Sequence, residues 1–331
     1  MVTFKDTDFL HAGSRIKSLE RKLLTQRQLI QMIEAPTLDE AWKMVNDAGI
    51  GVGVPLEQYE RALSENLAQT YEFLKNLSKG YDFLDLLRYE YDALNLKLLI
   101  KAQAMNKEQV ELVEMGSVPV SVLREEFRLQ KYQQIPRLLA EAVAEATDAL
   151  ARTGDPQWVD VIVDKAMLAA MLQKAKEYEI PFLHKLVKTK IDIANLRSVV
   201  RIQRIGKELD FVKRVLAPGG NLDVDDLAEA FTKGMDGIIA LIQGSDYGPI
   251  LDTALEALRS GKGLTQFERL CDDCITNVLD SVRLIPFGVE LLIVYAAAKE
   301  AEIKAVRIVM ASRLAGVAPE LIKERLRETY A

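Results

Sequence analysis

The sequence predicts an all-α protein. Leu, Ile, Ala and Met recur at spacings of three and four residues along nearly the whole chain, which is typical of amphipathic helices. The tetrapeptide "TLDE" (residues 37–40) is a capping-box pattern that marks the start of a helix. Several prolines fall at or near expected first helical turns, where a missing backbone N–H costs little: Pro136, Pro156, Pro249, Pro286 and Pro319. Alternating apolar and polar stretches typical of strands are scarce.

Length and composition predict a folded soluble protein with more than one core. The chain has 331 residues, which exceeds the usual size of a single core, so we expect two or three domains or lobes. Hydrophobic residues make up 49% and charged residues 28%. The formal net charge is −6, which argues against broad nucleic-acid binding because that function needs a basic excess on one face.

Cysteine usage and hydropathy predict a cytoplasmic chain that does not cross a membrane. The two cysteines, Cys271 and Cys274, cannot supply a disulfide framework, so a reducing compartment is the simpler interpretation. The N-terminal segment carries charges where a signal peptide needs an apolar core. The longest apolar run, residues 289–298, is about half of the roughly 20 residues needed to span a bilayer.

One pattern occurs three times along the chain. Each copy has an aromatic residue followed six positions later by an acid: Tyr59 and Glu65, Trp158 and Asp164, Phe267 and Asp273. A second acid follows the aromatic residue after 33, 34 and 35 positions, at Asp92, Asp192 and Glu302. We interpret these copies as three homologous lobes, each with a pair of long helices, around a pseudo-threefold axis.

The lobes are predicted to cover residues 1–115, 116–217 and 218–331. The seams between them contain Gly and Pro, in "LVEMGSVPVS" (112–121) and "VLAPGGNLD" (215–223). The third lobe carries an inserted-looking stretch at 242–250.

A polar signature begins at the second acid of each copy. "YDALNLKLLIK" (91–101) and "IDIANLRSVVR" (191–201) both place Asn three positions after Asp, followed by Leu and a basic residue. The third copy, "EIKAVR", keeps the acid and the base but has Ala305 in place of Asn. The candidate contact residues between lobes or with a partner are therefore Asp92, Asn95, Lys97, Asp192, Asn195, Arg197, Glu302 and Arg307.

The signature lies on helix faces that we expect to be buried. Asp92 and Asn95 share a face with Leu96 and Leu99, because separations of three, four and seven residues align on a helix. A buried carboxylate needs a partner, and a basic or amide group from another lobe or a second protein chain would serve. The signature can therefore fix how the lobes meet or form a partner-binding surface. Catalysis is disfavoured, because no His, metal cluster or nucleophile–base pair accompanies the acids.

Three further motifs resemble chemical sites only superficially. "GIGVGVP" (49–55) lacks the Lys–Ser/Thr of a phosphate-binding loop and follows a helix, so we expect a turn. "CDDC" (271–274) lacks a second Cys pair for zinc, which favours two buried side chains on a helix. "DVDD" (223–226) suggests the magnesium motif of isoprenoid synthases without a full DDxxD, so the first turn of a helix is the simpler interpretation.

The chain resembles the C subunit of the prokaryotic V/A-type ATPase, whose eukaryotic homologue is the d subunit of the V-ATPase. The resemblance rests on "YDALNLK", "IDIANLR", the threefold arrangement and the ending "KEAEIKAVRIVMASRLAGVAPELIKERL" (299–326), and it covers essentially the whole chain. The DxxNL(K/R) pattern of that family matches Asp92, Asn95 and Lys97, and again Asp192, Asn195 and Arg197. The third lobe departs from the pattern, because only Glu302 and Arg307 match.

The resemblance implies a non-catalytic protein without a cofactor. Its family is three-lobed and funnel-shaped, caps the membrane rotor ring of proteolipids and receives the base of the shaft formed by the D and F subunits. We therefore expect a peripheral protein at the cytoplasmic face of a membrane, with no direct span and no nucleic-acid partner. Two alternatives remain open: an unrelated helical scaffold or adaptor, and an enzyme resembling isoprenoid synthases. The neighbouring genes would separate these alternatives.

Overall fold

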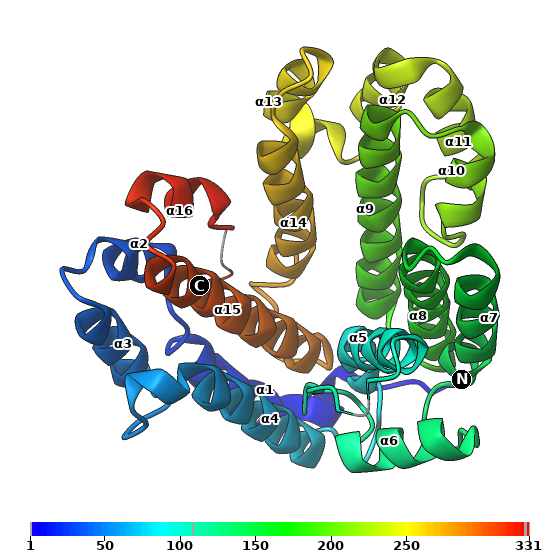
Figure 1. Ribbon diagram of the computed structural model, residues 1–331. Helices are drawn as coiled ribbons and strands as arrows, with labels where there is room; N and C mark the ends of the chain where they lie inside the picture. The colour runs from blue at the N-terminus through cyan, green and yellow to red at the C-terminus, as the bar shows by residue number, and fades with distance from the viewer. Residues whose placement is uncertain (1, 108, 328–329, 331) are drawn as a thin grey trace. The chain divides into compact units, whose positions relative to one another are not determined.

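The fold was analysed in a computed structural model that describes residues 2–107, 109–327 and 330 (Figure 1). In these residues the chain forms 16 α-helices and two short 3-10 helices, η1 (Asp6–Phe9) and η2 (Leu56–Gln58). The β-structure within the described residues is limited to an isolated bridge between Val2 and Tyr178. The predicted all-α class is confirmed.

The chain forms two compact units. The first unit contains Asp82–Ala228 together with Val2 and Thr3. The second unit contains Phe4–Tyr81 and the C-terminal part from Glu229 onward.

The first unit is built around α5 and α8. Helix α8 packs against α5, α7 and α9, and α5 also contacts α7. Leu96 of α5 and Val163 of α8 are fully buried. The helices of this unit are α5 (Asp85–Ala104), α6 (Val120–Leu129), α7 (Arg137–Thr153), α8 (Gln157–Glu177), α9 (Pro181–Ile205) and α10 (Leu209–Val215), with α11 (Val224–Thr232) at its C-terminal boundary.

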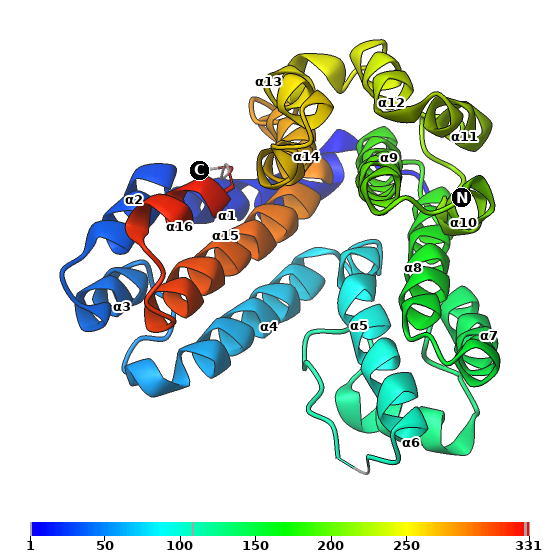
Figure 2. The ribbon, with the colours of Figure 1, turned by 45° about the horizontal axis from the view of Figure 1, so that its top comes forward.

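The second unit is built around α15, which runs alongside α4 in both views (Figures 1 and 2). Six consecutive residues of α15, 291–296, are buried. Because six residues cover every face of a helix, α15 is a central helix enclosed by its neighbours. The helices of this unit are α1 (Leu10–Glu20), α2 (Gln26–Glu34), α3 (Leu38–Asp47), α4 (Tyr59–Leu77), α12 (Gly234–Gln243), α13 (Gly248–Arg259), α14 (Leu264–Asp280), α15 (Glu290–Leu314) and α16 (Pro319–Arg325).

Local sequence signals explain where several helices begin. The Thr37 hydroxyl accepts a hydrogen bond from the Glu40 backbone N–H at 3.2 Å, so the "TLDE" pattern does cap α3. Thr25 and Gln28 form a reciprocal capping box at α2. Pro136 and Pro156 are the residues that immediately precede α7 and α8.

The three aromatic landmarks and the acids that follow them lie on corresponding elements. Tyr59, Trp158 and Phe267 fall in the first turns of α4, α8 and α14. Asp92, Asp192 and Glu302 lie on the next long helix of each copy, which is α5, α9 and α15 respectively.

The two compact units do not coincide with the predicted lobes 1–115, 116–217 and 218–331. Helix α5, from the predicted first lobe, packs on α7 and α8 of the predicted second lobe. Helix α15, from the predicted third lobe, packs on α2, α3 and α4 of the first. In these two cases the last long helix of a predicted lobe packs against another predicted lobe, whereas α9 packs on α8 and α10 of its own. The division into three lobes stays a prediction.

The three superficial motifs take structural roles. Residues 49–55 form a loop in which Gly49, Gly51 and Gly53 all have positive φ angles. Cys271 and Cys274 are buried on α14 and are not joined by a disulfide. In "DVDD", the Asp223 carboxylate accepts a hydrogen bond from the Asp225 N–H at 2.7 Å at the start of α11. Among the described helices, none is both long and apolar enough to cross a bilayer.

Candidate functional site

The Asp92 carboxylate is fully buried on α5 and binds the turn that precedes α6. Its Oδ2 atom accepts hydrogen bonds from the Ser117 backbone N–H at 3.0 Å and from the Ser117 hydroxyl at 2.5 Å. Its Oδ1 atom accepts a hydrogen bond from the Val118 N–H at 3.3 Å. One side chain therefore fixes two consecutive peptide groups just before a helix begins.

Asn95 holds the same connecting segment one helical turn further along α5. Its side-chain amide donates to the Val113 carbonyl at 2.8 Å, and its Oδ1 atom accepts from the Val113 N–H at 2.8 Å. The paired bonds satisfy both backbone groups of Val113, so the Asp–Asn spacing of the signature binds a single stretch of backbone at two points.

The second copy of the signature repeats this arrangement on α9. Asp192 is fully buried, and its Oδ2 atom accepts from the Asn221 N–H at 2.9 Å and from the Asn221 side-chain amide at 3.0 Å. Its Oδ1 atom accepts from the Leu222 N–H at 3.0 Å. Asn195 makes the same paired bonds to the Ala217 backbone, both at 2.8 Å.

The third copy keeps the acid but changes its surroundings. Glu302 on α15 is buried, and its Oε1 atom accepts a hydrogen bond from the Leu24 N–H at 2.6 Å. Its Oε2 atom binds the Lys299 ammonium at 2.6 Å. Ala305 replaces the asparagine, so the second point of attachment seen in the other two copies is missing here.

Each of the three acids accepts a hydrogen bond from a backbone N–H group at the same position relative to the helix that follows. Val118, Leu222 and Leu24 each lie two residues before a short helix, which begins at Val120, Val224 and Gln26 respectively. We call each contact between the acid and this N–H group a latch, and name it after its acid: the Asp92, Asp192 and Glu302 latches. The third acid binds the N-terminal part of the chain.

Two glycines leave room for the aspartate latches. A Cβ atom on Gly116 would lie 2.1 Å from Asp92 Oδ1, and one on Gly220 would lie 1.9 Å from Asp192 Oδ1. Neither glycine has a positive φ angle, so the requirement is for space and not for a special backbone conformation. Neither was predicted as a site residue, although both lie in the predicted seams 112–121 and 215–223.

The basic residues of the signature join neighbouring helices. The Lys97 ammonium on α5 binds Asp164 on α8 at 2.6 Å. Arg307 on α15 binds Glu60 on α4 at 2.8 Å. Arg197 occupies the matching position on α9 and is half-buried, and its role as a contact residue stays a prediction.

The expected basic or amide partner of Asp92 is replaced by backbone N–H groups and a hydroxyl. For Asp192, the Asn221 side chain does supply one amide, beside two backbone N–H groups. Backbone donors suit this position because they lie outside a helix and need an acceptor, and the bonds that they make are buried or partly buried. The latches are therefore structural attachments within the chain.

Burial and hydrogen bonding have opposite effects on the pKa of the Asp92 carboxyl. Burial raises the pKa of this carboxyl above its usual value, whereas the bonds from Ser117 and Val118 and the nearby Arg88 charge lower it, and burial is the larger effect. Within the part of the chain that the structure describes, no cluster of three or more His, Cys, Asp or Glu side chains is arranged to hold a metal ion.

Three long helices each bind the turn before a short helix through a buried acid. This recurring contact is typical of a helical protein built from repeated units. The sequence profile of the family described as ATP synthase (C/AC39) subunit matches residues 12–325. The chain belongs to this family. This membership disfavours the two alternatives, an unrelated scaffold and an enzyme resembling isoprenoid synthases.

Relatives of similar length support this assignment. The C subunit of the A-type ATP synthase of Methanothermobacter thermautotrophicus is 24% identical, over 96% of this chain and 87% of the relative. The corresponding A-type protein of Thermococcus gammatolerans is 28% identical, over 99% of this chain and 92% of the relative. The C subunit of the V-type sodium ATPase of Enterococcus hirae is 21% identical, over 95% of this chain and 97% of the relative.

Adding a methyl group at either latch glycine should destabilise the protein. Gly116→Ala and Gly220→Ala would push the carboxylate away from its N–H donors, and each buried donor left unpaired costs about 1–3 kcal/mol. We expect each variant to lose at least about 2 kcal/mol in urea unfolding, because two donors are affected. Gly244→Ala is the matched control, since its Cβ would meet only ordinary contacts at 3.5 Å. Equal stability of all three variants would exclude a structural role for the latches.

The raised pKa of Asp92 predicts a specific pH dependence. A carboxyl whose pKa is higher in the folded state contributes stability that is lost as the pH rises from the unfolded pKa, about 3.9, through the folded pKa. The difference in unfolding free energy between the native protein and Asp92→Asn should therefore fall as the pH rises across this window, and then level off. Urea unfolding of both proteins at a series of pH values measures the difference. A difference that grows with pH would mean that the N–H donors outweigh burial.

Proposed function

We propose that this chain is the non-catalytic central-stalk subunit of a rotary V/A-type ATPase. In this role it couples the shaft formed by the D and F subunits to the membrane ring of proteolipids. It would sit as a peripheral protein at the cytoplasmic face of the membrane. The observation that carries the proposal is the family match over residues 12–325, which spans both compact units.

The internal construction of the chain suits the transmission of torque. A protein that couples a shaft to a ring must not deform when one end is driven and the other is loaded. Within each unit, buried or partly buried polar contacts join long helices in addition to the apolar core. In the second unit the Tyr71 hydroxyl on α4 donates to Glu300 on α15 at 2.5 Å, and in the first unit Lys190 on α9 binds Glu90 on α5 at 2.5 Å. Such directional contacts resist sliding of one helix along another.

We infer that the chain is organised as three homologous lobes in a funnel with pseudo-threefold symmetry. The common register of the Asp92, Asp192 and Glu302 latches supports this organisation. Each latch links the last long helix of one repeat to the start of another, and the third links back to the first repeat. This cyclic order is the connectivity that a closed three-lobed body requires.

Exposed apolar residues at the ends of the three latch helices are candidate partner contacts. Met105 follows the last residue of α5, and Ile205 and Leu314 are the last residues of α9 and α15. Their exposed fractions are 62%, 59% and 52%. Large apolar side chains left exposed at matching positions favour contact with a partner. By contrast, the acids Asp92, Asp192 and Glu302 are buried and are poorly placed to touch one.

The coupling role is tested by assembly and pumping. The purified chain should bind a complex of the D and F subunits and show no ATPase activity of its own. A reconstituted ATPase without this chain should hydrolyse ATP but should not pump ions, because the shaft is no longer attached to the ring. Normal coupled pumping in its absence would refute the proposal.

The binding assay also tests whether the exposed apolar residues at the ends of α5, α9 and α15 contact a partner. The triple variant Met105→Ser, Ile205→Ser and Leu314→Ser should weaken binding to the D–F complex or to the ring. Leu129→Ser is the control, since Leu129 is also exposed, at 47%, but ends α6, which is not a latch helix. Unchanged assembly of the triple variant would remove these residues from the interface without affecting the family assignment.

A further inference from the structure

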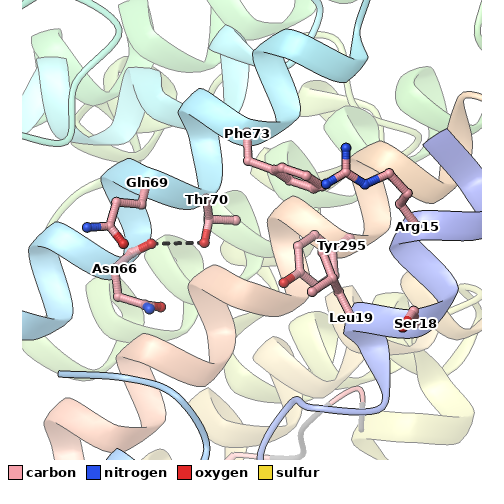
Figure 3. Close-up of a pocket in the computed structure, with 8 residues that line it drawn as sticks. All are labelled: Arg15, Ser18, Leu19, Asn66, Gln69, Thr70, Phe73 and Tyr295. Carbon is pink, nitrogen blue, oxygen red and sulfur yellow. Dashed lines mark hydrogen bonds between the residues drawn. The ribbon is translucent and has the colours of Figure 1, made fainter. Parts of the chain in front are cut away.

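A cavity with both polar and apolar lining residues lies within the second unit, between α1, α4 and α15 (Figure 3). Its volume is about 370 Å³, which falls in the lower part of the range of small-molecule sites. Arg15 and Ser18 come from α1, Asn66, Gln69 and Phe73 from α4, and Tyr295 from α15. None of these residues belongs to a latch, so the fold does not use the cavity for the contacts described above.

Four polar side chains at this cavity make no hydrogen bond with any described residue. They are Ser18, Asn66, Gln69 and Tyr295. The Asn66 Oδ1 atom is buried and still lacks a donor. Tyr295 is only 6% exposed, and burial raises the pKa of its hydroxyl to about 12, so it remains a neutral donor at physiological pH. Ser18 and Gln69 are exposed and can bind water, but a buried polar atom such as Asn66 Oδ1 nearly always has a partner in a native protein, and its lack of one here points to a missing ligand.

The charge at the cavity is positive. The Arg15 guanidinium lies 4.8 Å from the centre of the Phe73 ring, which orients it, and it forms no ion pair with the described carboxylates. The lining contains no acid. The acids whose charges act on Tyr295 have other partners, since Glu20 binds Lys17 and Glu302 binds Lys299. The guanidinium is therefore available to an anion.

We propose that this cavity binds a small phosphorylated polyol. The phosphoryl oxygens would accept hydrogen bonds from Arg15, which suits oxyanions through its planar fork, and from the neighbouring hydroxyl and amide donors. A hydroxyl on the carbon chain of the ligand would donate to Asn66 Oδ1. Phe73 and Tyr295 provide apolar walls for the carbon chain (Figure 3). This site is independent of the coupling function.

Two sources supply this chemistry: a free polyol phosphate and the headgroup of phosphatidylglycerol. Calorimetric titration of the full chain with glycerol 3-phosphate, glycerol and inorganic phosphate examines the free form. Cosedimentation with phosphatidylglycerol vesicles, compared with phosphatidylcholine vesicles, examines the headgroup. Glycerol 3-phosphate should bind more tightly than either of its two parts, because both the guanidinium and Asn66 then have partners.

Two variants with the same change of charge test whether Arg15 is the anion-binding group. Arg15→Gln should weaken binding by about ten- to a hundredfold, the effect of losing a charged hydrogen bond. Arg21→Gln is the matched control, since Arg21 directly follows α1 and does not line the cavity. Both residues are exposed, so neither variant should impair folding, and circular dichroism checks this.

The outcomes separate clearly. Arg15-dependent binding of glycerol 3-phosphate supports a free ligand, and Arg15-dependent binding of the vesicles alone supports a lipid headgroup. Equal weakening by Arg15→Gln and Arg21→Gln would indicate non-specific attraction and would overturn the proposal. So would the absence of binding to glycerol 3-phosphate and to the vesicles at millimolar ligand concentration. None of these results alters the coupling assay.

Discussion

The fold depends on carboxylates that are buried in apolar helices and accept backbone N–H groups. An ionised carboxylate inside a protein is costly unless it is hydrogen-bonded, and unpaired backbone donors carry a cost of their own. The Asp92, Asp192 and Glu302 latches give the backbone donors an acceptor and offset part of the cost of burying the acid, although burial still raises the pKa of Asp92. Each latch therefore requires that the turn before a short helix lie against a long helix. At Asp92 and Asp192 the turn can come close enough only because Gly116 and Gly220 have no side chain.

This constraint connects the local sequence to the mechanical role that we propose. A latch fixes the start of a short helix against a long helix, and ion pairs such as Lys97 with Asp164 and Arg307 with Glu60 then join the long helices side by side. The third latch differs, because Glu302 also binds Lys299 and has no neighbouring asparagine. A chain built from repeated, directional contacts suits a body that transmits force, and it needs no reactive group to do so.

Much of the architecture could be predicted from helical periodicity and spacing. The all-α class, the paired long helices and the burial of Asp92 follow from which residues share a helix face. The partners of the acids could not be predicted, because Ser117 and Val118 reach Asp92 only through the path of a connecting segment. The packing of α5 on α8, which joins two predicted lobes, likewise could not be predicted from spacing. The cavity escaped prediction because Arg15 and Tyr295 meet only after folding.

Native-state hydrogen exchange at three amide groups tests the central claim most directly. If the latches hold the turns, the backbone N–H groups of Val118, Leu222 and Leu24 should exchange as slowly as amides within the neighbouring helices, although all three lie outside helices. Val52, exposed in the glycine-rich loop, gives the fast reference rate. Exchange of the three amides at the rate of Val52 would contradict the account, since the carboxylates would then leave these turns open to water.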